Sequence, residues 1–230
     1  MKTTLSHQER GFTLVDVLLM VAAFSILTFV FLPDLSRRRH TRCRMACSNN
    51  LKQIGLAFKV WALDNNDKFP MQVAVTNGGT MEFVDSGSVY VHFLVMSNEL
   101  STPRLLICPQ ETDSNRVAAS TFSQNLSNSS PNTVPFTNDN NVSYFVAVDA
   151  QETYPQMVLV GDGNISIDGR RATRGLNAIG TNRIVAWQKP RHDGFGNVGL
   201  ADGSVQRFNA KWLTQLFRTT GAATNRIAFP

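Results

Sequence analysis

The first apolar pattern is a single long run near the start of the chain. It covers residues 14–32 and reads LVDVLLMVAAFSILTFVFL. At about 1.5 Å per residue in a helix, this length reaches roughly 30 Å, the thickness of the hydrocarbon core of a bilayer. The run is longer than the apolar core of a secretory signal peptide, and no small-x-small cleavage site follows it. We therefore predict a transmembrane helix over 12–33 behind a polar leader over 1–11.

A second apolar pattern has the period of a helix. Between residues 35 and 64, apolar residues recur at spacings of three and four, which predicts an amphipathic helix with one buried face. Turn-forming residues at 64–67 end the pattern before Phe69 and Pro70. We assign this stalk helix to 34–66. Its apolar stripe consists of Cys43, Cys47, Leu51, Ile54, Phe58, Trp61 and Ala62.

After residue 67 the helical period disappears, and short β-branched and aromatic runs alternate with turn formers. We expect a β-rich globular head over 67–230, with a surface loop over 120–141 and a short helix over 210–217. The predicted fold class is α+β, in which a long N-terminal helix, half membrane-spanning and half amphipathic, packs on a small antiparallel sheet. The predicted strands are 88–96, 104–108, 143–147, 157–161, 184–186, 196–200 and 204–208.

Composition and charge narrow the class of protein. The chain has 230 residues, of which 43% are hydrophobic and 17% are charged, so it is not disordered by composition. Its mean hydropathy of -0.12 excludes several membrane spans. The net charge of +5 permits nucleic acid or anionic lipid as a partner. Arginines crowd into 37–44 without interleaved aromatic residues, so we interpret them as a face toward inner-membrane lipids rather than nucleic acid.

The three cysteines predict one disulfide. Cys43 and Cys47 lie one helical turn apart, which holds their Cβ atoms about 5–6 Å apart, beyond the roughly 3.5–4.5 Å of a disulfide. Cys108 follows the apolar run 105–107 and precedes a proline. We predict a bond between Cys47 and Cys108 that ties the stalk helix to the head in an oxidising compartment. The alternative is that all three cysteines are buried free thiols.

The segment 192–204 reads HDGFGNVGLADGS and has two interpretations. Asp202 and Gly203 suit the tight turn of a β-hairpin, because this dipeptide accepts positive φ. His192 with Asp193 and Asp202 could instead supply metal ligands or active-site groups, with the Ser204 hydroxyl beside them. We prefer the structural interpretation, since the hairpin explains the Asp-Gly pair without any chemistry.

No catalytic residue and no cofactor is expected. The chain contains no nucleophile elbow, Walker motif or HExxH motif. The carboxylates of Asp162, Asp168 and Asp202 are weak candidates for calcium, but the loop 162–169 lacks glycine at the position that an EF-hand requires. We therefore predict no metal site and keep calcium only as an alternative.

Asp16 conflicts with the apolar run that contains it. A carboxylate at the centre of a bilayer costs on the order of 2.5–3.5 kcal/mol. A cation would lower this cost, and cleavage after Gly11 would supply one as the free amino group of Phe12. The pairing could join the same chain or a neighbouring one.

The stretch GFTLVDVLL resembles the prepilin signal of type IV pilins and of type II secretion pseudopilins. The resemblance implies that prepilin peptidase cuts after Gly11 and methylates the new amino terminus at Phe12. It also implies that Asp16, where the family usually has Glu, sets the register with another subunit during assembly. Pro33 falls where family members commonly carry a helix-kinking proline. The implied fold is pilin-like.

Two further stretches are similar to a family of prepilin-processed pseudopilin-like proteins. The stalk helix contains Asn-Asn-Leu-Lys-Gln-Ile-Gly-Leu-Ala at 49–57, before an acidic, Asn-rich turn. Near the C-terminus, His192 is followed after nine residues by Asp202 and Gly203, the carboxy-terminal motif of the same family at 192–203. The resemblance therefore covers both ends of the chain.

The expected function is that of a membrane-anchored subunit of a type II secretion pseudopilus or a type IV pilus-like filament, with no enzymatic activity. The expected partners are prepilin peptidase, other pilin or pseudopilin subunits, and inner-membrane lipids. The expected location is the bacterial inner membrane, with a single span and the head in the periplasm or outside the cell. The alternative is an anchored binding or enzymatic head, for a polysaccharide or a metal ion, that uses the prepilin signal only for export.

Overall fold

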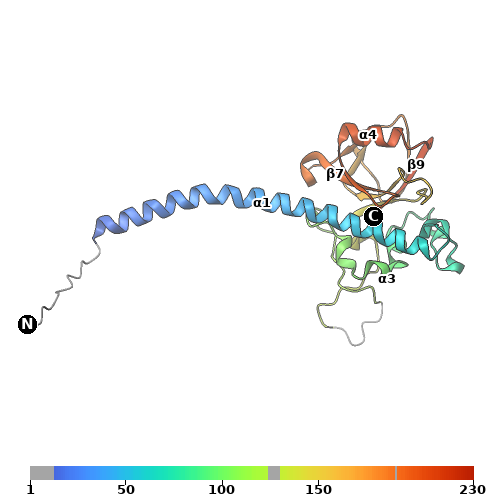
Figure 1. Ribbon diagram of the computed structural model, residues 1–230, viewed down its shortest axis with the longest axis horizontal. Helices are drawn as coiled ribbons and strands as arrows, with labels where there is room; N and C mark the ends of the chain where they lie inside the picture. Colours follow the sequence, from blue (N-terminus) through green and yellow to red (C-terminus); the bar gives the residue numbers. More distant parts are fainter. Residues whose placement is uncertain (1–12, 124–129, 190) are drawn as a thin grey trace, which may run out of the picture. The chain divides into compact units, whose positions relative to one another are not determined.

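The computed structural model describes residues 13–123, 130–189 and 191–230, and for residues 30–41 it describes the backbone alone. The chain divides into two compact units, residues 1–42 and residues 43–230. We call them the N-terminal unit and the C-terminal unit and describe each by itself. The first helix, α1 (Leu14–Leu63), begins in one unit and ends in the other (Figure 1).

The start of α1 is stabilised by a reciprocal pair of hydrogen bonds. Asp16 Oδ2 accepts from the backbone N–H of Thr13 at 2.9 Å and from the Thr13 hydroxyl at 2.8 Å. In return, the Thr13 Oγ1 accepts from the backbone N–H of Asp16 at 3.3 Å. This is a capping box, which satisfies donors that the first turn of a helix leaves unpaired. These hydrogen bonds from Thr13 lower the pKa of Asp16.

The prediction of a transmembrane helix over 12–33 is wrong. None of the helices in the described part of the chain is long and apolar enough to cross a membrane. Asp16 lies in the first turn of α1. The predicted fold class keeps its α+β character but loses the membrane half, and the predicted single-pass location in the inner membrane loses its support.

In the C-terminal unit, the end of α1 buries the predicted stripe. Every member of the stripe from Cys47 to Ala62 is at most 6% exposed, whereas Cys43 is half-buried. The helix ends at Leu63, directly before the predicted turn, where Asn66 and Asp67 adopt positive φ. The helical period of the apolar residues therefore identified this element and its buried face correctly.

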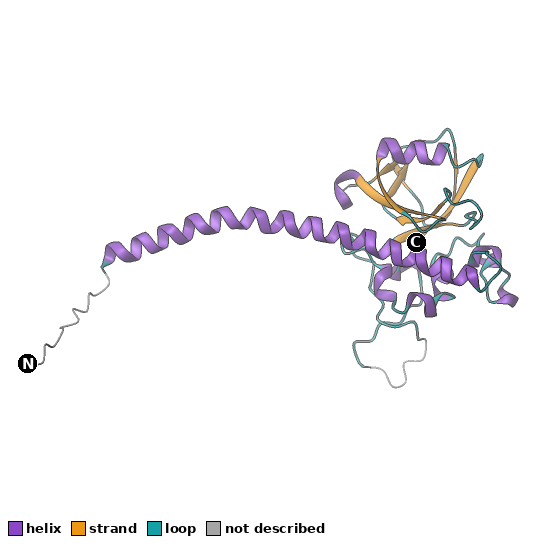
Figure 2. Ribbon diagram, viewed as in Figure 1, coloured by secondary structure: helices purple, strands orange, loops and turns teal. Residues whose placement is uncertain are grey.

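The C-terminal unit contains two antiparallel sheets, and Figure 2 shows their strands together, with helices and loops forming the rest (Figure 2). The larger sheet has six strands in the order β5-β9-β1-β2-β7-β8, and the smaller has three in the order β4-β3-β6. The strands are β1 (Tyr144–Ala147), β2 (Val158–Asp162), β3 (Ile165–Ile167), β4 (Arg170–Arg171), β5 (Gly175–Gly180), β6 (Val185–Trp187), β7 (Phe195–Leu200), β8 (Val205–Asn209) and β9 (Thr224–Phe229).

The centre of the larger sheet is buried on both faces, as β1 and β2 show. Along β1, Tyr144 and Val146 belong to the same core as α1, whereas Phe145 and Ala147 belong to a second core. Helix α4 (Ala210–Arg218) contributes Leu213 and Phe217 to that second core and lies beside β6 and β8. Alternate residues of a strand point to opposite faces, so an all-apolar strand such as β1 is expected where both faces are covered.

Two of the predicted strands are helical, and several strands were missed. Residues 88–96 contain α2 (Tyr90–Leu94), and Val89, Phe93 and Met96 are fully buried at helical spacing. Residues 104–108 lie largely in a 3₁₀ helix that begins at Pro103. Strands β3, β4, β5 and β9 were not predicted, and of these β3 and β4 span only three and two residues. The remaining helices are α3 (Ser97–Leu100), η1 (Pro70–Gln72), η2 (Val75–Asn77), η3 (Met81–Phe83), η4 (Pro103–Leu106), η5 (Asp139–Asn141) and η6 (Arg191–Gly194).

His92 on α2 is fully buried and makes one polar contact. Its Nδ1 lies 2.7 Å from the hydroxyl oxygen of Thr80, and its Nε2 has no hydrogen-bond partner among the described residues. Burial lowers the pKa of His92 from 6.5 to about 4. The unfolded chain therefore takes up a proton on His92 below pH 6.5, whereas the folded chain does so only near pH 4. Through this group, the folded state loses stability as the pH falls from 6.5 to 4.

Replacing His92 by glutamine is expected to flatten the pH dependence of stability. Between pH 7 and pH 4.5, the wild type should lose about 2–3 kcal/mol of unfolding free energy through His92 alone. The amide does not titrate, so His92→Gln should lack this part of the loss. Urea unfolding of both proteins at the two pH values measures the difference. Equal losses in the two proteins would contradict the assignment.

Candidate functional site

Four side chains from four separate elements meet in the interior of the C-terminal unit. Cys47 lies on α1, Cys108 follows η4, Asp162 ends β2, and His192 lies in η6. All four are buried, with exposed fractions of 2% or less. Their sulfur, oxygen and nitrogen atoms lie within 4.8 Å of one another. We call these four residues the buried centre.

Cys47 and Cys108 form a disulfide, with Cα atoms 5.5 Å apart and a sequence separation of 61. The predicted pairing is therefore confirmed, and Cys43 is the free cysteine. The bond joins α1 to the chain that follows η4, which is the connection predicted between the stalk helix and the head. Both cysteines belong to the larger hydrophobic core of the unit, so the bond is a covalent link inside that core.

His192 contacts the other groups of the buried centre through one ring nitrogen. Its Nε2 lies 3.4 Å from Cys108 Sγ and 3.4 Å from Asp162 Oδ2. The backbone that carries the ring has an unusual conformation, since His192 and Asp193 both have φ of 56°. Residues other than glycine rarely adopt this left-handed conformation, and such positions concentrate at functional sites.

Asp162 is oriented by the neighbouring strand β7. Its Oδ2 accepts from the backbone N–H of Asn197 at 2.7 Å and from the Asn197 side-chain amide at 3.0 Å. Its Oδ1 is buried and has no hydrogen-bond partner among the described residues. One carboxylate oxygen is therefore held in place, and the other is left available.

Tyr144 and Asn50 line the side of Cys47. The Tyr144 hydroxyl lies 3.6 Å from Cys47 Sγ and accepts a hydrogen bond from Asn50 Nδ2 at 3.4 Å. Burial is the main cause that raises the pKa of Tyr144, and the negative charge of Asp162 acts in the same direction. The phenol therefore stays neutral throughout the physiological pH range.

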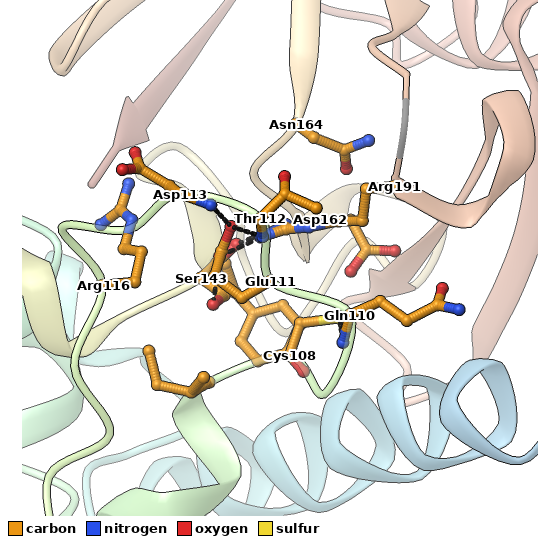
Figure 3. A network of polar contacts seen from close by, with 12 residues as sticks. Cys108, Gln110, Glu111, Thr112, Asp113, Arg116, Ser143, Asp162, Asn164 and Arg191 are labelled. Atoms are coloured by element: carbon orange, nitrogen blue, oxygen red, sulfur yellow. Dashed lines mark hydrogen bonds and ion pairs between the residues drawn. The ribbon is translucent and has the colours of Figure 1, made fainter. Parts of the chain in front are cut away.

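A buried ion pair lies next to His192 in sequence. Arg191 is 4% exposed, and its Nη2 pairs with Glu111 Oε2, which also accepts from the Ser143 hydroxyl at 2.6 Å. The Arg191 Nη1 donates to the backbone carbonyl of Ser143 at 3.3 Å. Figure 3 shows Glu111, Ser143 and Arg191 joined in this network, with Asp162 and Cys108 in the same view (Figure 3). Burial acts to raise the pKa of Glu111, but Arg191 and the hydrogen bonds outweigh it, so the pKa is lowered overall.

Glu111 and Arg191 also line a polar pocket of about 350 Å³. Asp113 and Arg171 form an ion pair at 3.1 Å on its wall, and Arg116 reaches the carbonyl of Pro230 at 2.6 Å. Figure 3 shows Asp113 and Arg116 beside the Glu111 network. The pocket is therefore lined by charges of both signs, four of which form the pairs Glu111–Arg191 and Asp113–Arg171.

The hairpin interpretation of Asp202 and Gly203 fits the structure. The turn joins β7 to β8, with Gly203 at φ of 83°. Asp202 is exposed, and its Oδ1 accepts from the backbone N–H of Ser204 at 2.8 Å. Asp193 is exposed, whereas His192 is buried. The alternative grouping of His192 with Asp193 and Asp202 is therefore not formed.

The calcium candidates are also separated. Asp162 is fully buried, whereas Asp168 is exposed on the turn after β3, where it pairs with Arg183 and accepts from the backbone N–H of Ile184. Together with the exposed Asp202, the three carboxylates do not form a shared site. Asp162 instead belongs to the buried centre.

The two stretches that carried the second resemblance meet in the fold. A Cβ atom on Gly55 of α1 would lie 3.4 Å from Gly203 Cα in the β7–β8 turn. The absence of side chains at both positions lets the helix and the turn approach closely. Gly11 and Phe12 lie outside the described residues. Pro33 lies within α1, and the predicted kink there stays a prediction.

Three residues near the buried centre were not predicted from the sequence, namely Glu111, Arg191 and Asn197. No motif marks them, although Arg191 directly precedes the His192 that was singled out. The capping role of Asp16 was not predicted either, although the spacing Thr13-x-x-Asp16 was a readable signal. Comparison of the chain with protein-family models, with curated proteins and with solved structures finds no match.

Proposed function

We propose that this protein is a filament subunit of the type II secretion pseudopilus or type IV pilus-like kind, processed by prepilin peptidase between Gly11 and Phe12. The proposal assigns it an assembly role, with other pilin or pseudopilin subunits as partners and without enzymatic activity. The match of GFTLVDVLL to the prepilin signal motivates it.

The observation that carries the proposal is the exposure of the apolar helix in the N-terminal unit. Its large apolar side chains are more than half exposed, from Leu14 at 77% to Phe29 at 82%. A helix that is apolar on all sides is normally buried against other elements, and large exposed apolar surfaces mark interaction sites. Packing against the same segment of neighbouring subunits would remove these side chains from water.

Asp16 provides the sharpest test, because its capping role and its proposed assembly role need different properties. Asp16→Asn keeps an oxygen that can accept from the Thr13 N–H but removes the charge that would pair with a neighbour's amino terminus. We expect Asp16→Asn to reduce the sedimentable filament fraction at least about tenfold, because a charge-assisted bond is roughly twice as strong as a neutral one. Asp16→Glu, which retains the charge, is the matched control.

Two outcomes contradict this assignment. If Asp16→Asn assembles as well as the wild type, Asp16 acts only as a helix cap. If mass spectrometry of the chain from cells with active prepilin peptidase finds it still beginning at Met1, the processing step is wrong. A processed chain should begin at Phe12.

A second candidate is a binding head for a polysaccharide, which the polar pocket beside Glu111 favours. Charged and amide side chains such as Asp113, Arg171 and Gln188 line this pocket. Under this alternative, Asp113→Ala with Arg171→Ala abolishes retention on immobilised polysaccharide and leaves filament assembly intact. Under the filament proposal, the two substitutions change neither.

A further inference from the structure

We propose that the buried centre is a metal site, in which Cys47, Cys108, Asp162 and His192 bind a divalent ion of the zinc class when the disulfide is reduced. The inference is independent of the proposed function. It assigns two alternative states to the same four residues. In one state the two cysteines form a disulfide, and in the other all four residues bind a metal ion.

The first support is geometric. Zinc bonds of about 2.0–2.3 Å in a tetrahedron place neighbouring ligand atoms about 3.3–3.8 Å apart. His192 Nε2 lies 3.4 Å from both Cys108 Sγ and Asp162 Oδ2, which are two edges of such a tetrahedron. All four donor atoms lie within 4.8 Å of one another. Reduction releases the two sulfurs to move apart and complete it.

The second support is the unmet bonding capacity of the buried carboxylate. Asp162 is fully buried, and its Oδ1 has no hydrogen-bond partner among the described residues. Buried polar atoms are normally paired, and an unpaired one calls for a specific explanation. A cation bound between the carboxylate and the imidazole would compensate the burial of Asp162.

The third support is that Asn197 already orients the proposed ligand Asp162. Asn197 donates twice to Asp162 Oδ2, and the strand β7 that carries it is fixed in the larger sheet. Groups that hold a metal-ligating carboxylate in this way commonly change metal affinity 10–100-fold when they are removed. The backbone at His192 and Asp193 is left-handed, and the imidazole lies against Cys108 Sγ.

The donor set selects the type of ion. Two thiolates and an imidazole are soft or intermediate ligands that suit zinc, whereas calcium requires six to eight oxygens. Asp162 is the single carboxylate of the buried centre. The site therefore differs from the calcium alternative considered from the sequence, which relied on the separated Asp168 and Asp202.

The change of state balances with a dithiol as the reductant. The dithiol gives two electrons and two protons to the Cys47–Cys108 bond and closes into its own cyclic disulfide, which leaves two cysteine thiols. Binding of the metal ion then forms two metal–sulfur bonds and releases both thiol protons to solvent. Metal binding should therefore acidify an unbuffered solution and weaken as the pH falls.

The test uses the full chain, reduced with dithiothreitol without oxygen and separated from the reductant by gel filtration. We expect the reduced protein to bind one equivalent of Zn²⁺ and the oxidised protein to bind none, measured by competition with a chromophoric chelator. Co²⁺ in place of Zn²⁺ should give the intense visible bands of a tetrahedral thiolate complex. Cys43→Ala is the matched control and should bind like the wild type. Asp162→Asn removes a ligand itself, so its affinity should fall by at least the about 10–100-fold that the loss of an outer-shell partner costs.

Several results would overturn the proposal. One is a folded, reduced chain that takes up less than about a tenth of an equivalent of Zn²⁺ at concentrations where structural sites fill. Another is uptake that persists in Cys47→Ala/Cys108→Ala or disappears in Cys43→Ala. If the reduced chain is unfolded without metal, circular dichroism during Zn²⁺ addition decides: recovery of the folded signal supports the site, and no recovery overturns it.

Discussion

Replacement of both Cys47 and Cys108 by alanine is expected to lower the free energy of unfolding by about 4 kcal/mol. The disulfide closes a loop with a sequence separation of 61. The loss of chain entropy that such a loop imposes on the unfolded state corresponds to roughly this value. Both sulfurs are fully buried, so their removal also costs packing in the core that α1 shares with the sheet. Alanine is chosen because a serine hydroxyl would bury a further polar group.

The measurement is urea unfolding of the oxidised wild type and of the double variant, both in the presence of a chelator. Cys43→Ala is the control, since Cys43 is half-buried and outside the bond, and its midpoint should match that of the wild type. The reduced wild type, also with chelator, should approach the double variant. A loss of less than about 1 kcal/mol in the double variant would show that the bond contributes little beyond ordinary packing.

Arg191→Met is expected to destabilise the protein by about 3–5 kcal/mol, because it leaves the Glu111 carboxylate buried without its cation. Arg191 is 4% exposed and Glu111 is 13% exposed at the side chain. The Ser143 hydroxyl and the backbone N–H groups of Thr112 and Asp113 would still donate to the carboxylate, but no cation would pair with it as Arg191 does. The matched control is Arg171→Met, which breaks the exposed pair with Asp113 and should cost at most about 1 kcal/mol.

The pH dependence of the same pair supplies a second readout. The pKa of Glu111 is lowered from its ordinary value of 4.5, so its contribution to stability is present above that value. This contribution is lost as the pH falls from about 4.5 through the lower folded-state pKa. Glu111→Gln should lack this acid-side loss. Adding Glu111→Gln to Arg191→Met should restore part of the stability, and an additive cost of the two substitutions would contradict the coupling.

The parts of the fold that could be predicted depend on local periodicity. The stalk stripe from Cys47 to Ala62 keeps a helical spacing over several turns, and it is buried as expected. The Asp202-Gly203 turn follows from backbone preferences of two adjacent residues. The predicted strands at 88–96 and 104–108 failed because β-branched composition alone does not distinguish a buried strand from a short buried helix.

The transmembrane prediction shows a different limit. The count of apolar residues over 14–32 suggested a span, but no helix in the described part of the chain is long and apolar enough for one. The exposed apolar side chains between Leu14 and Phe29 still need a partner. In the proposed function, that partner is the same segment of neighbouring subunits.

The sequence by itself predicted the amphipathic half of α1, the Cys47–Cys108 pairing and the hairpin at Gly203. Helical period and turn preference act over a few residues, and the reach of a disulfide leaves few pairings among three cysteines. Only the tertiary structure decided that Asp162 and His192 join the two cysteines. They come from elements far apart in the chain, and sheet pairing and the left-handed backbone at His192 bring them together. No local pattern encodes such a convergence, since it arises from packing that involves the whole C-terminal unit.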